Sequence, residues 1–262
     1  MGSADTYIAV DNVAKRYASL TGSINALSPA SFEIRENEFV SIVGPSGCGK
    51  STLLMIIGGL VPPSHGSVTI KSTRVSGPYT ALGFVFQQDV LLDWRTVLQN
   101  ILLQARIRRM DKAKATARAR ELLRLVGLEG FEDKYPHELS GGMRQRVAIC
   151  RALLHEPDLL LMDEPFGALD AIARDQLNED LLRYRHQARK TILFVTHSIP
   201  EAVFLSDRIF VMSPRPGRIE EIISIDLPHP RPLSIRETPR FGEYVGQITR
   251  IFETVGVFRK GA

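Results

Sequence analysis

The pattern of apolar and polar residues changes along the chain and divides it into stretches with different predicted structures. Residues 30–34 alternate strictly, as in a strand with one buried face, whereas residues 39–43 form a compact β-rich run that leads into a glycine-rich loop. Residues 159–162 and 191–196 are further apolar runs, and helical stretches separate them. This order of short strands and helices predicts an α/β fold with a mostly parallel sheet covered on both faces.

Helices are predicted between these strands and at the end of the chain. The helix that begins near residue 51 should stop at Gly58, and most of residues 91–156 should be helical. Ser140 is a favourable N-cap for a helix that runs toward Pro157, and Thr238 predicts the start of a last helix. This last helix either docks on its own chain or contacts a second subunit, because its apolar residues follow the helical period. They are Phe241, Tyr244, Val245, Ile248, Ile251, Phe252 and Val255.

The bulk composition excludes several classes of protein. A hydrophobic content of 44% and a charged content of 24% are ordinary for a globular protein, and a net charge of +4 is too small for a dedicated nucleic-acid binder. No apolar run approaches the roughly 18 residues of a membrane-spanning helix. The first residues lack the features of a signal peptide and the two cysteines form no disulfide pattern, so we expect a reducing, cytosolic compartment.

Basic residues gather between positions 104 and 124, which indicates either a solvated helix face or a face turned toward anionic lipid headgroups.

A glycine-rich loop between a predicted strand and a predicted helix supplies the first candidate chemistry. Its glycines let consecutive backbone N–H groups converge on phosphate oxygens, and the following helix adds its positive N-terminal dipole. Lys50 can then reach the β- and γ-phosphates of a nucleotide, and Ser51 can ligate Mg²⁺. The candidate ATP-binding residues of this loop are Gly44, Pro45, Ser46, Gly47, Cys48, Gly49, Lys50, Ser51 and Thr52.

Two acidic residues follow the apolar run at 159–162. Asp163 can hold Mg²⁺, directly or through water, and Glu164 can act as the general base on an attacking water. An unpaired buried carboxylate is costly, so an acidic pair at the end of a buried strand indicates a functional site. The carboxyl ends of parallel strands are where ligands bind in such sheets, and His197 follows the next apolar run at the corresponding place.

A second glycine-rich run, Leu139-Ser140-Gly141-Gly142-Met143-Arg144-Gln145, lies 23 residues before Asp163 if counted from Ser140. Alone it could be no more than a helix-capping turn. Together with the first loop it resembles the ATP-binding cassette family, the ATPase subunits of membrane transporters, over residues 7–225. The resemblance implies a P-loop NTPase core with a mostly parallel sheet, an N-terminal antiparallel β subdomain and an α-helical subdomain inserted at about 90–157. The ATPase domain would then span residues 6–227, and residues 228–262 would form a Pro-rich connector and an amphipathic helix.

The resemblance also implies roles for further residues. Tyr17 matches the aromatic residue that stacks on adenine, and Gln87 (Gln88 is the alternative register) matches a glutamine that touches Mg²⁺ and water. His197 matches a histidine that contacts the γ-phosphate. The segment Ala168-Leu169-Asp170 matches a loop that crosses the interface of a dimer. In that dimer two ATP molecules, each with Mg²⁺, lie between the subunits. The residues of one subunit that are expected to contact the ATP held by the phosphate loop of the other subunit are Leu139, Ser140, Gly141, Gly142, Gln145 and Asp170.

Two segments narrow the resemblance to importers. Residues 91–97 read Leu-Leu-Asp-Trp-Arg-Thr-Val, which is similar to the Leu-Leu-Pro-Trp-Arg-Thr-Val segment of the nitrate, sulfonate and taurine importer ATPases, and Asp93 departs from it. The tail around residues 227–232 is similar too. These features imply a peripheral ATPase on the cytoplasmic side of the cell membrane, paired with an identical or related subunit. Its partners would be an integral membrane permease, docked near residues 87–103, and an extracytoplasmic solute-binding protein. An exporter or lipid-extraction complex and a non-transport cassette ATPase are the alternatives.

Cys48 adds a separate hypothesis. It lies among the amides of the phosphate loop, close to a helix N-terminus and Lys50, which is an environment that can favour a thiolate. The sequence therefore predicts that alkylation of Cys48 inactivates the enzyme and that MgATP protects it.

Overall fold

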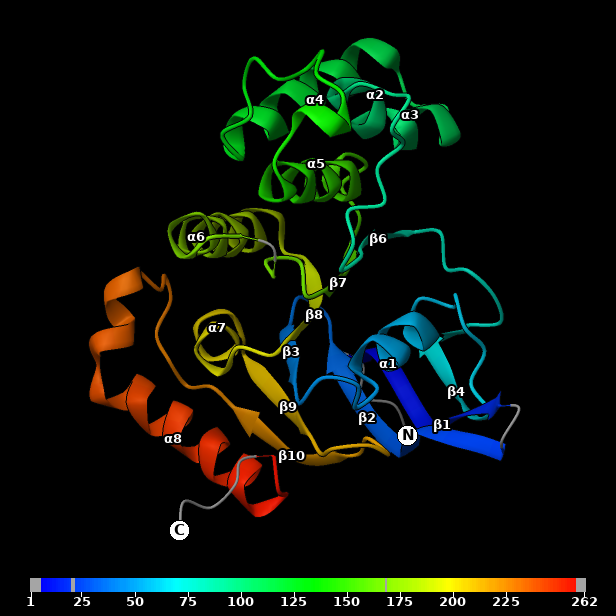
Figure 1. Cartoon of the computed structure of the whole chain (residues 1–262), viewed down its shortest axis with the longest axis vertical. Helices are drawn as coiled ribbons and strands as arrows, with labels where there is room; N and C mark the ends of the chain where they lie inside the picture. The colour runs from blue at the N-terminus through cyan, green and yellow to red at the C-terminus, as the bar shows by residue number, and fades with distance from the viewer. Residues whose placement is uncertain (1–5, 20–21, 168, 258–262) are drawn as a thin grey trace.

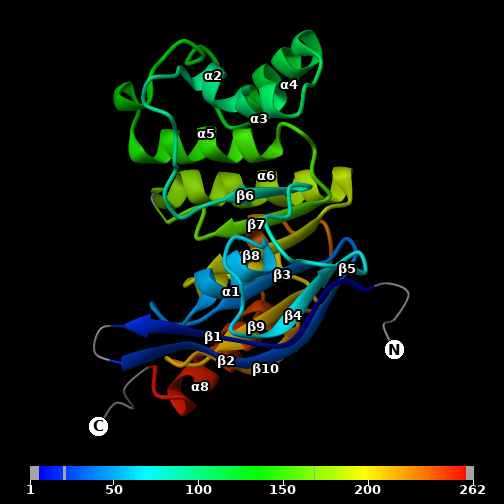
Figure 2. The same cartoon turned by 90° about the vertical axis from the view of Figure 1, so that its right-hand side faces the viewer.

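The computed structural model describes residues 6–19, 22–167 and 169–257. Its secondary structure lies in layers along the long axis (Figure 1), and the view from the side shows the same order (Figure 2). A group of helices lies at one end, the six-stranded sheet with further helices follows, and the four-stranded sheet lies toward the other end, which the last helix of the chain also reaches. The predicted α/β class is confirmed.

The four-stranded sheet is antiparallel and has the strand order β2-β1-β4-β5. The strands are β1 Thr6–Ser19, β2 Gly22–Arg35, β4 His65–Ile70 and β5 Thr73–Arg74. The alternation seen in the sequence is realised in β2, where Ala30, Phe32 and Ile34 are buried and the residues between them are exposed. This sheet is the N-terminal antiparallel region that the resemblance implied.

The six-stranded sheet has the order β10-β9-β3-β8-β7-β6 and is parallel except for β10. Its central strands β3, β7 and β8 are buried along their whole length, which explains why they read as continuous apolar runs. Each fully buried aliphatic or aromatic side chain stabilises the fold by about 1.5–3 kcal/mol. The strands are β3 Phe39–Val43, β6 Leu82–Val85, β7 Leu159–Asp163, β8 Thr191–Thr196, β9 Arg208–Met212 and β10 Ile219–Ser224.

The helices divide into a terminal group and a group that covers the large sheet (Figure 1). The terminal group comprises α2 Val97–Ile101, α3 Leu103–Ile107, α4 Lys112–Leu125 and α5 Gly141–Leu153, with a 3₁₀ turn at Pro136–Glu138 before α5. The other helices are α1 Lys50–Ile57, α6 Ala171–Ala188, α7 Ile199–Leu205 and α8 Pro239–Thr254, and a 3₁₀ turn at Leu233–Glu237 precedes α8.

The predicted helix caps agree with the structure. The side chain of Ser140 accepts a hydrogen bond from the backbone N–H of Met143, and that of Thr238 accepts one from Phe241. The described part of the chain contains no helix that is long and apolar enough to cross a membrane.

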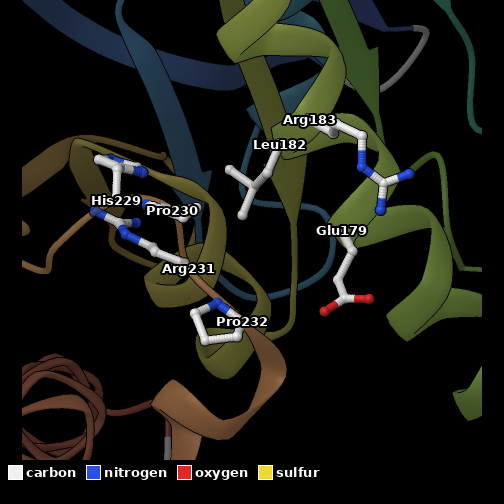
Figure 3. A pocket seen from close by; sticks show the side chains of 7 residues that line it. All are labelled: Glu179, Leu182, Arg183, His229, Pro230, Arg231 and Pro232. Atoms are coloured by element: carbon white, nitrogen blue, oxygen red, sulfur yellow. The ribbon is translucent and has the colours of Figure 1, made fainter.

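The tail docks on its own chain, which was one of the two possibilities for α8. Phe241, Tyr244, Ile248 and Phe252 are buried in the same hydrophobic core as α7 and the large sheet. The sequence predicted a Pro-rich connector before this helix, and the structure shows that the connector also borders a cavity. Residues 229–232 face Leu182 and Arg183 of α6 across a cavity of about 540 Å³ (Figure 3).

Arg231 anchors the connector. Its side chain is only 4% exposed, and the guanidinium donates hydrogen bonds to the carbonyl oxygens of Val203 and Phe204 in α7 and of Ser206 just after it. Further bonds reach the carbonyls of Ile225 and Leu227. Burial lowers the pKa of Arg231 to about 10, so the guanidinium remains charged at neutral pH. One side chain thus satisfies the C-terminal carbonyls of α7 and ties the tail to that helix.

We predict that Arg231→Ala lowers the free energy of unfolding by about 2–4 kcal/mol, because it leaves buried carbonyl groups without donors. Thermal unfolding and limited proteolysis of residues after 227 measure the effect. Arg250→Ala is the matched control, since Arg250 is an exposed arginine of α8. Equal melting temperatures for the two variants would contradict the anchoring role.

Candidate nucleotide-binding site

The candidate site lies where the central parallel strands end. Val43 of β3 pairs with Thr196 of β8, and Asp163 of β7 pairs with Val195, so the carboxyl ends of the three strands meet at one edge. The glycine-rich loop follows β3, the acidic pair ends β7, and His197 follows β8. The structure therefore brings together three motifs that lie between Gly44 and His197 in the sequence.

The glycine-rich loop wraps around the N-terminus of α1. Gly49 has a φ of 106°, and a Cβ atom added there would lie 2.6 Å from the carbonyl oxygen of Ala26, so only glycine fits. Lys50 is 4% exposed, and its Nζ donates hydrogen bonds to the carbonyl oxygens of Gly44 (2.9 Å) and Pro45 (3.0 Å). The ammonium group is thereby held across the loop, close to the backbone amides that bind phosphate in such loops.

Asp163 and Ser51 place two oxygen ligands side by side. The Ser51 hydroxyl donates a hydrogen bond of 2.9 Å to Oδ1 of Asp163. Burial is the largest influence on the pKa of Asp163 and raises it, whereas the hydrogen bond from Ser51 lowers it. Within the described ranges, no group of three His, Cys, Asp or Glu side chains could hold a metal ion on its own. Mg²⁺ characteristically combines one or two protein oxygens with phosphate oxygens, so a hydroxyl next to a carboxylate fits this ion.

Glu164 is the point on which the other polar side chains converge. Its Oε2 accepts a hydrogen bond of 3.3 Å from Nε2 of Gln87 and lies 3.1 Å from Nδ1 of His197. Its Oε1 lies 3.9 Å from Nζ of Lys50. The backbone of Glu164 has a positive φ of 45°, and its N–H donates to the carbonyl oxygen of Val195. A carboxylate surrounded in this way is oriented to accept a proton from a water molecule at the sheet edge.

A cavity of about 480 Å³ lies beside Lys50, Gln87 and Glu164, whereas Asp163 and His197 are not among its lining residues. Tyr17 and Gln87 line this cavity. Gln88, the alternative to Gln87, is not among the lining residues that the structure describes. Three lining residues have no counterpart in the sequence-based prediction, and no local motif marks them: Ile24, Ala26 and Arg215. The loop itself contributes Ser46, Gly47, Gly49, Lys50, Ser51 and Thr52.

The second glycine-rich run lies elsewhere. Among the described residues that line the cavity, none belongs to the run 139–145. Ser140 is exposed at the start of α5, in the terminal group of helices (Figure 1). Asp170 caps α6 through a hydrogen bond from the backbone N–H of Ala173, and the neighbouring Ala168 lies outside the described residues. Within one chain the two glycine-rich motifs do not form a common site.

Two side chains of that run are buried within their own chain, and their contact with ATP held by a partner stays a prediction. Leu139 is buried in the hydrophobic core, and Gln145 is only 3% exposed. The Gln145 side chain donates a hydrogen bond of 3.1 Å to the carbonyl oxygen of Phe86, next to Gln87. Both side chains therefore pack within their own chain.

The hypothesis of a reactive Cys48 thiolate is wrong. The side chain is 1% exposed and packs beneath the loop, where a Cβ atom on Gly44 would lie 2.9 Å from its sulfur. Burial raises the pKa of the Cys48 thiol and outweighs the nearby Lys50, which lowers it. The sequence placed Cys48 next to a cation, but it did not indicate that the side chain points into the core.

Comparison with known proteins matches this chain to ATP-binding proteins of transporters, both by sequence and by structure. The family model described as "ABC transporter" matches residues 27–167. The chain is 42% identical to an aliphatic sulfonates import ATP-binding protein of Bacillus cereus, over 96% of this chain and 98% of the relative. It is 44% identical to a taurine import ATP-binding protein of Rhizobium johnstonii, over 97% and 99%. A dimeric ATP-binding cassette solved in a post-hydrolysis state with ADP and Pi matches with a TM-score of 0.77 and 35% identity, over 84% of this chain and 99% of that one.

We predict that Cys48 reacts slowly with thiol reagents in the folded protein. Its raised pKa keeps the thiol protonated at pH 7.5, and the thiolate forms only as the pH rises above the range of an ordinary cysteine. The rate of modification is measured in Cys150→Ser, which leaves a single thiol, with and without denaturant. Rapid labelling of the folded variant at pH 7.5 would restore the thiolate hypothesis.

Proposed function

Because the chain belongs to the ATP-binding cassette transporter family and is an ATP hydrolase, we propose that it is the ATPase subunit of an importer for a small solute of the nitrate, sulfonate or taurine type. The observation that carries this proposal is the near full-length likeness to import ATP-binding proteins named for aliphatic sulfonates and taurine. In this proposal residues 6–227 form the ATPase domain, and residues 228–262 form the appended connector and helix.

The side chains at the sheet edge suit the hydrolysis of ATP. Tyr17 would stack on adenine, while the loop amides and Lys50 would hold the β- and γ-phosphates. Ser51, Asp163 and Gln87 would hold Mg²⁺, which neutralises charge on the phosphates. Glu164 would take the proton of the attacking water, and His197 would orient the γ-phosphate and that water. Positioning and charge stabilisation supply most of the catalysis in such reactions.

A second subunit would complete each site. The exposed hydroxyl of Ser140 and the backbone N–H groups near Gly142, at the N-terminus of α5, are suitable donors for a γ-phosphate. Since they do not reach the cavity of their own chain, we propose that they bind the ATP held by a partner. The dimeric state of a structural relative solved with ADP and Pi supports this arrangement.

The segment after Gln87 has the features of a docking site for the permease. The fully buried Asn100 pins it, because the Asn100 side chain accepts from the N–H of Leu92 and donates to the carbonyls of Leu92 and Arg95. Trp94 is 73% exposed on this pinned loop, and Val90 of the same segment is also exposed. An exposed tryptophan on a rigid loop is a typical anchor of a protein interface.

Three side chains of α5 connect this segment to the second glycine-rich run. Arg144 pairs with Asp89 at 2.9 Å, and Arg151 donates to the carbonyls of Asp89 and Val90. Gln145 adds its bond to Phe86. A shift of α5 on closure of the dimer would therefore move residues 86–90 and the permease helices docked on them.

Transport tests the proposal directly. We expect the tagged subunit, purified from its native membranes in mild detergent, to retain an integral membrane protein. The complex is reconstituted in proteoliposomes with ATP on the side of the ATPase subunit. Taurine or an aliphatic sulfonate is added on the opposite side together with its solute-binding protein. We expect the solute to be transported to the side that contains ATP. Glu164→Gln should abolish this uptake. ATP-driven movement in the reverse direction would favour an exporter, and the absence of any membrane partner would favour a non-transport ATPase.

We predict that Trp94→Ala weakens association with the permease by about 30-fold, because a buried tryptophan anchor is lost. Hydrolysis by the isolated subunit should not change, since Trp94 does not line the nucleotide cavity. Co-purification and the basal ATPase rate are measured side by side. Ile107→Ala is the control, because Ile107 is 67% exposed but lies outside residues 87–103. Loss of association in both variants would contradict a specific role for Trp94.

A further inference from the structure

Arg215 shares the nucleotide cavity although none of the recognised motifs contains it. It lies in the turn between β9 and β10 and lines the cavity together with Tyr17 and Lys50. Its Nη2 lies 3.7 Å from the position that a Cβ atom of Gly47 would occupy. The side chain is exposed, and in the described ranges no hydrogen bond or ion pair engages its guanidinium. A cation aimed over the phosphate loop is thus available to a ligand.

The turn that carries Arg215 is held firmly against the loop. The N–H of Ser213 donates to the carbonyl of Arg218 and closes the turn. Gly217 accepts from the N–H of Ser28 at 2.8 Å and donates to the carbonyl of Ala26 at 3.3 Å. A Cβ atom on Gly217 would lie 1.9 Å from the carbonyl oxygen of Cys48, so the turn and the phosphate loop are in direct backbone contact. These bonds hold the turn that carries Arg215 beside the cavity.

We propose that Arg215 is a nucleotide-binding residue that contacts the part of the polyphosphate chain common to ATP and ADP. The proposal rests on the placement of ATP in this cavity. A guanidinium forms two parallel hydrogen bonds with a phosphate, which makes arginine well suited to this contact. Lys50 and Glu164 lie close to each other and line the part of the cavity where we place the terminal phosphate. The turn that carries Arg215 is hydrogen-bonded instead to β2, and Ile24 and Ala26 of β2 also line the cavity. Arg215 therefore acts on binding and not on the chemical step.

Binding and kinetics of Arg215→Ala test this assignment. We expect KM for ATP to rise about tenfold, which corresponds to roughly 1.4 kcal/mol of lost binding free energy. The kcat should stay the same, because an interaction made equally with substrate and transition state affects only KM. Calorimetric titration should show an equal loss of affinity for ADP and none for adenosine. Arg215→Lys should retain part of the affinity, since it keeps the charge but not the paired geometry.

Two controls separate the possible failures. Arg250→Ala removes the same charge from the exposed face of α8 and should leave KM unchanged. Lys50→Ala tests the cavity itself: if it does not weaken ATP binding, the nucleotide lies elsewhere and the proposed site is wrong. If Lys50→Ala weakens ATP binding but Arg215→Ala leaves ATP and ADP affinity unchanged, only the role of Arg215 is wrong. An equal loss of affinity for adenosine would likewise overturn the phosphate contact.

Discussion

The parallel pairing of β3, β7 and β8 is the interaction on which the rest of this structure depends. Their backbone hydrogen bonds set the register in which Val43 faces Thr196 and Asp163 faces Val195. A slip of one residue would turn Asp163 and its neighbours to the opposite face of the sheet. Both faces of these strands are buried, one against α1 and the antiparallel sheet and the other against helices, which gives this register a large energetic advantage over its alternatives. The phosphate loop, the acidic pair and His197 owe their proximity to this pairing.

A second constraint links the site to the surface where we place the permease. Helix α5 begins at the second glycine-rich run and holds residues 86–90 through Arg144, Gln145 and Arg151. The same segment carries Gln87, whose amide reaches Glu164. Contacts at the start of α5 and contacts at Trp94 can therefore influence each other through one short stretch of chain. Such a connection is what the coupling of hydrolysis to transport requires.

The sequence predicted most accurately those structural features that depend only on residues close together in the chain. Ser140 and Thr238 cap helices because an N-cap bond reaches only three residues ahead, and the alternation in 30–34 reflects one strand with one buried face. It failed where the outcome depends on which way a side chain turns in the folded core. Cys48 points beneath the loop, which does not follow from its position in a motif. Arg231 and Arg215 were missed because their surroundings come from distant segments.

The most direct test of the account is to combine Glu164→Gln with measurements of ATP turnover and oligomeric state. Glutamine keeps the shape of the side chain but cannot accept the proton of water, so the rate of hydrolysis should fall by about 10²–10⁴-fold. The variant should accumulate as a dimer with bound ATP in light scattering, while the wild type turns over and returns to monomers. A variant that stays monomeric with ATP and hydrolyses it at the wild-type rate would contradict both the role of Glu164 and the shared site.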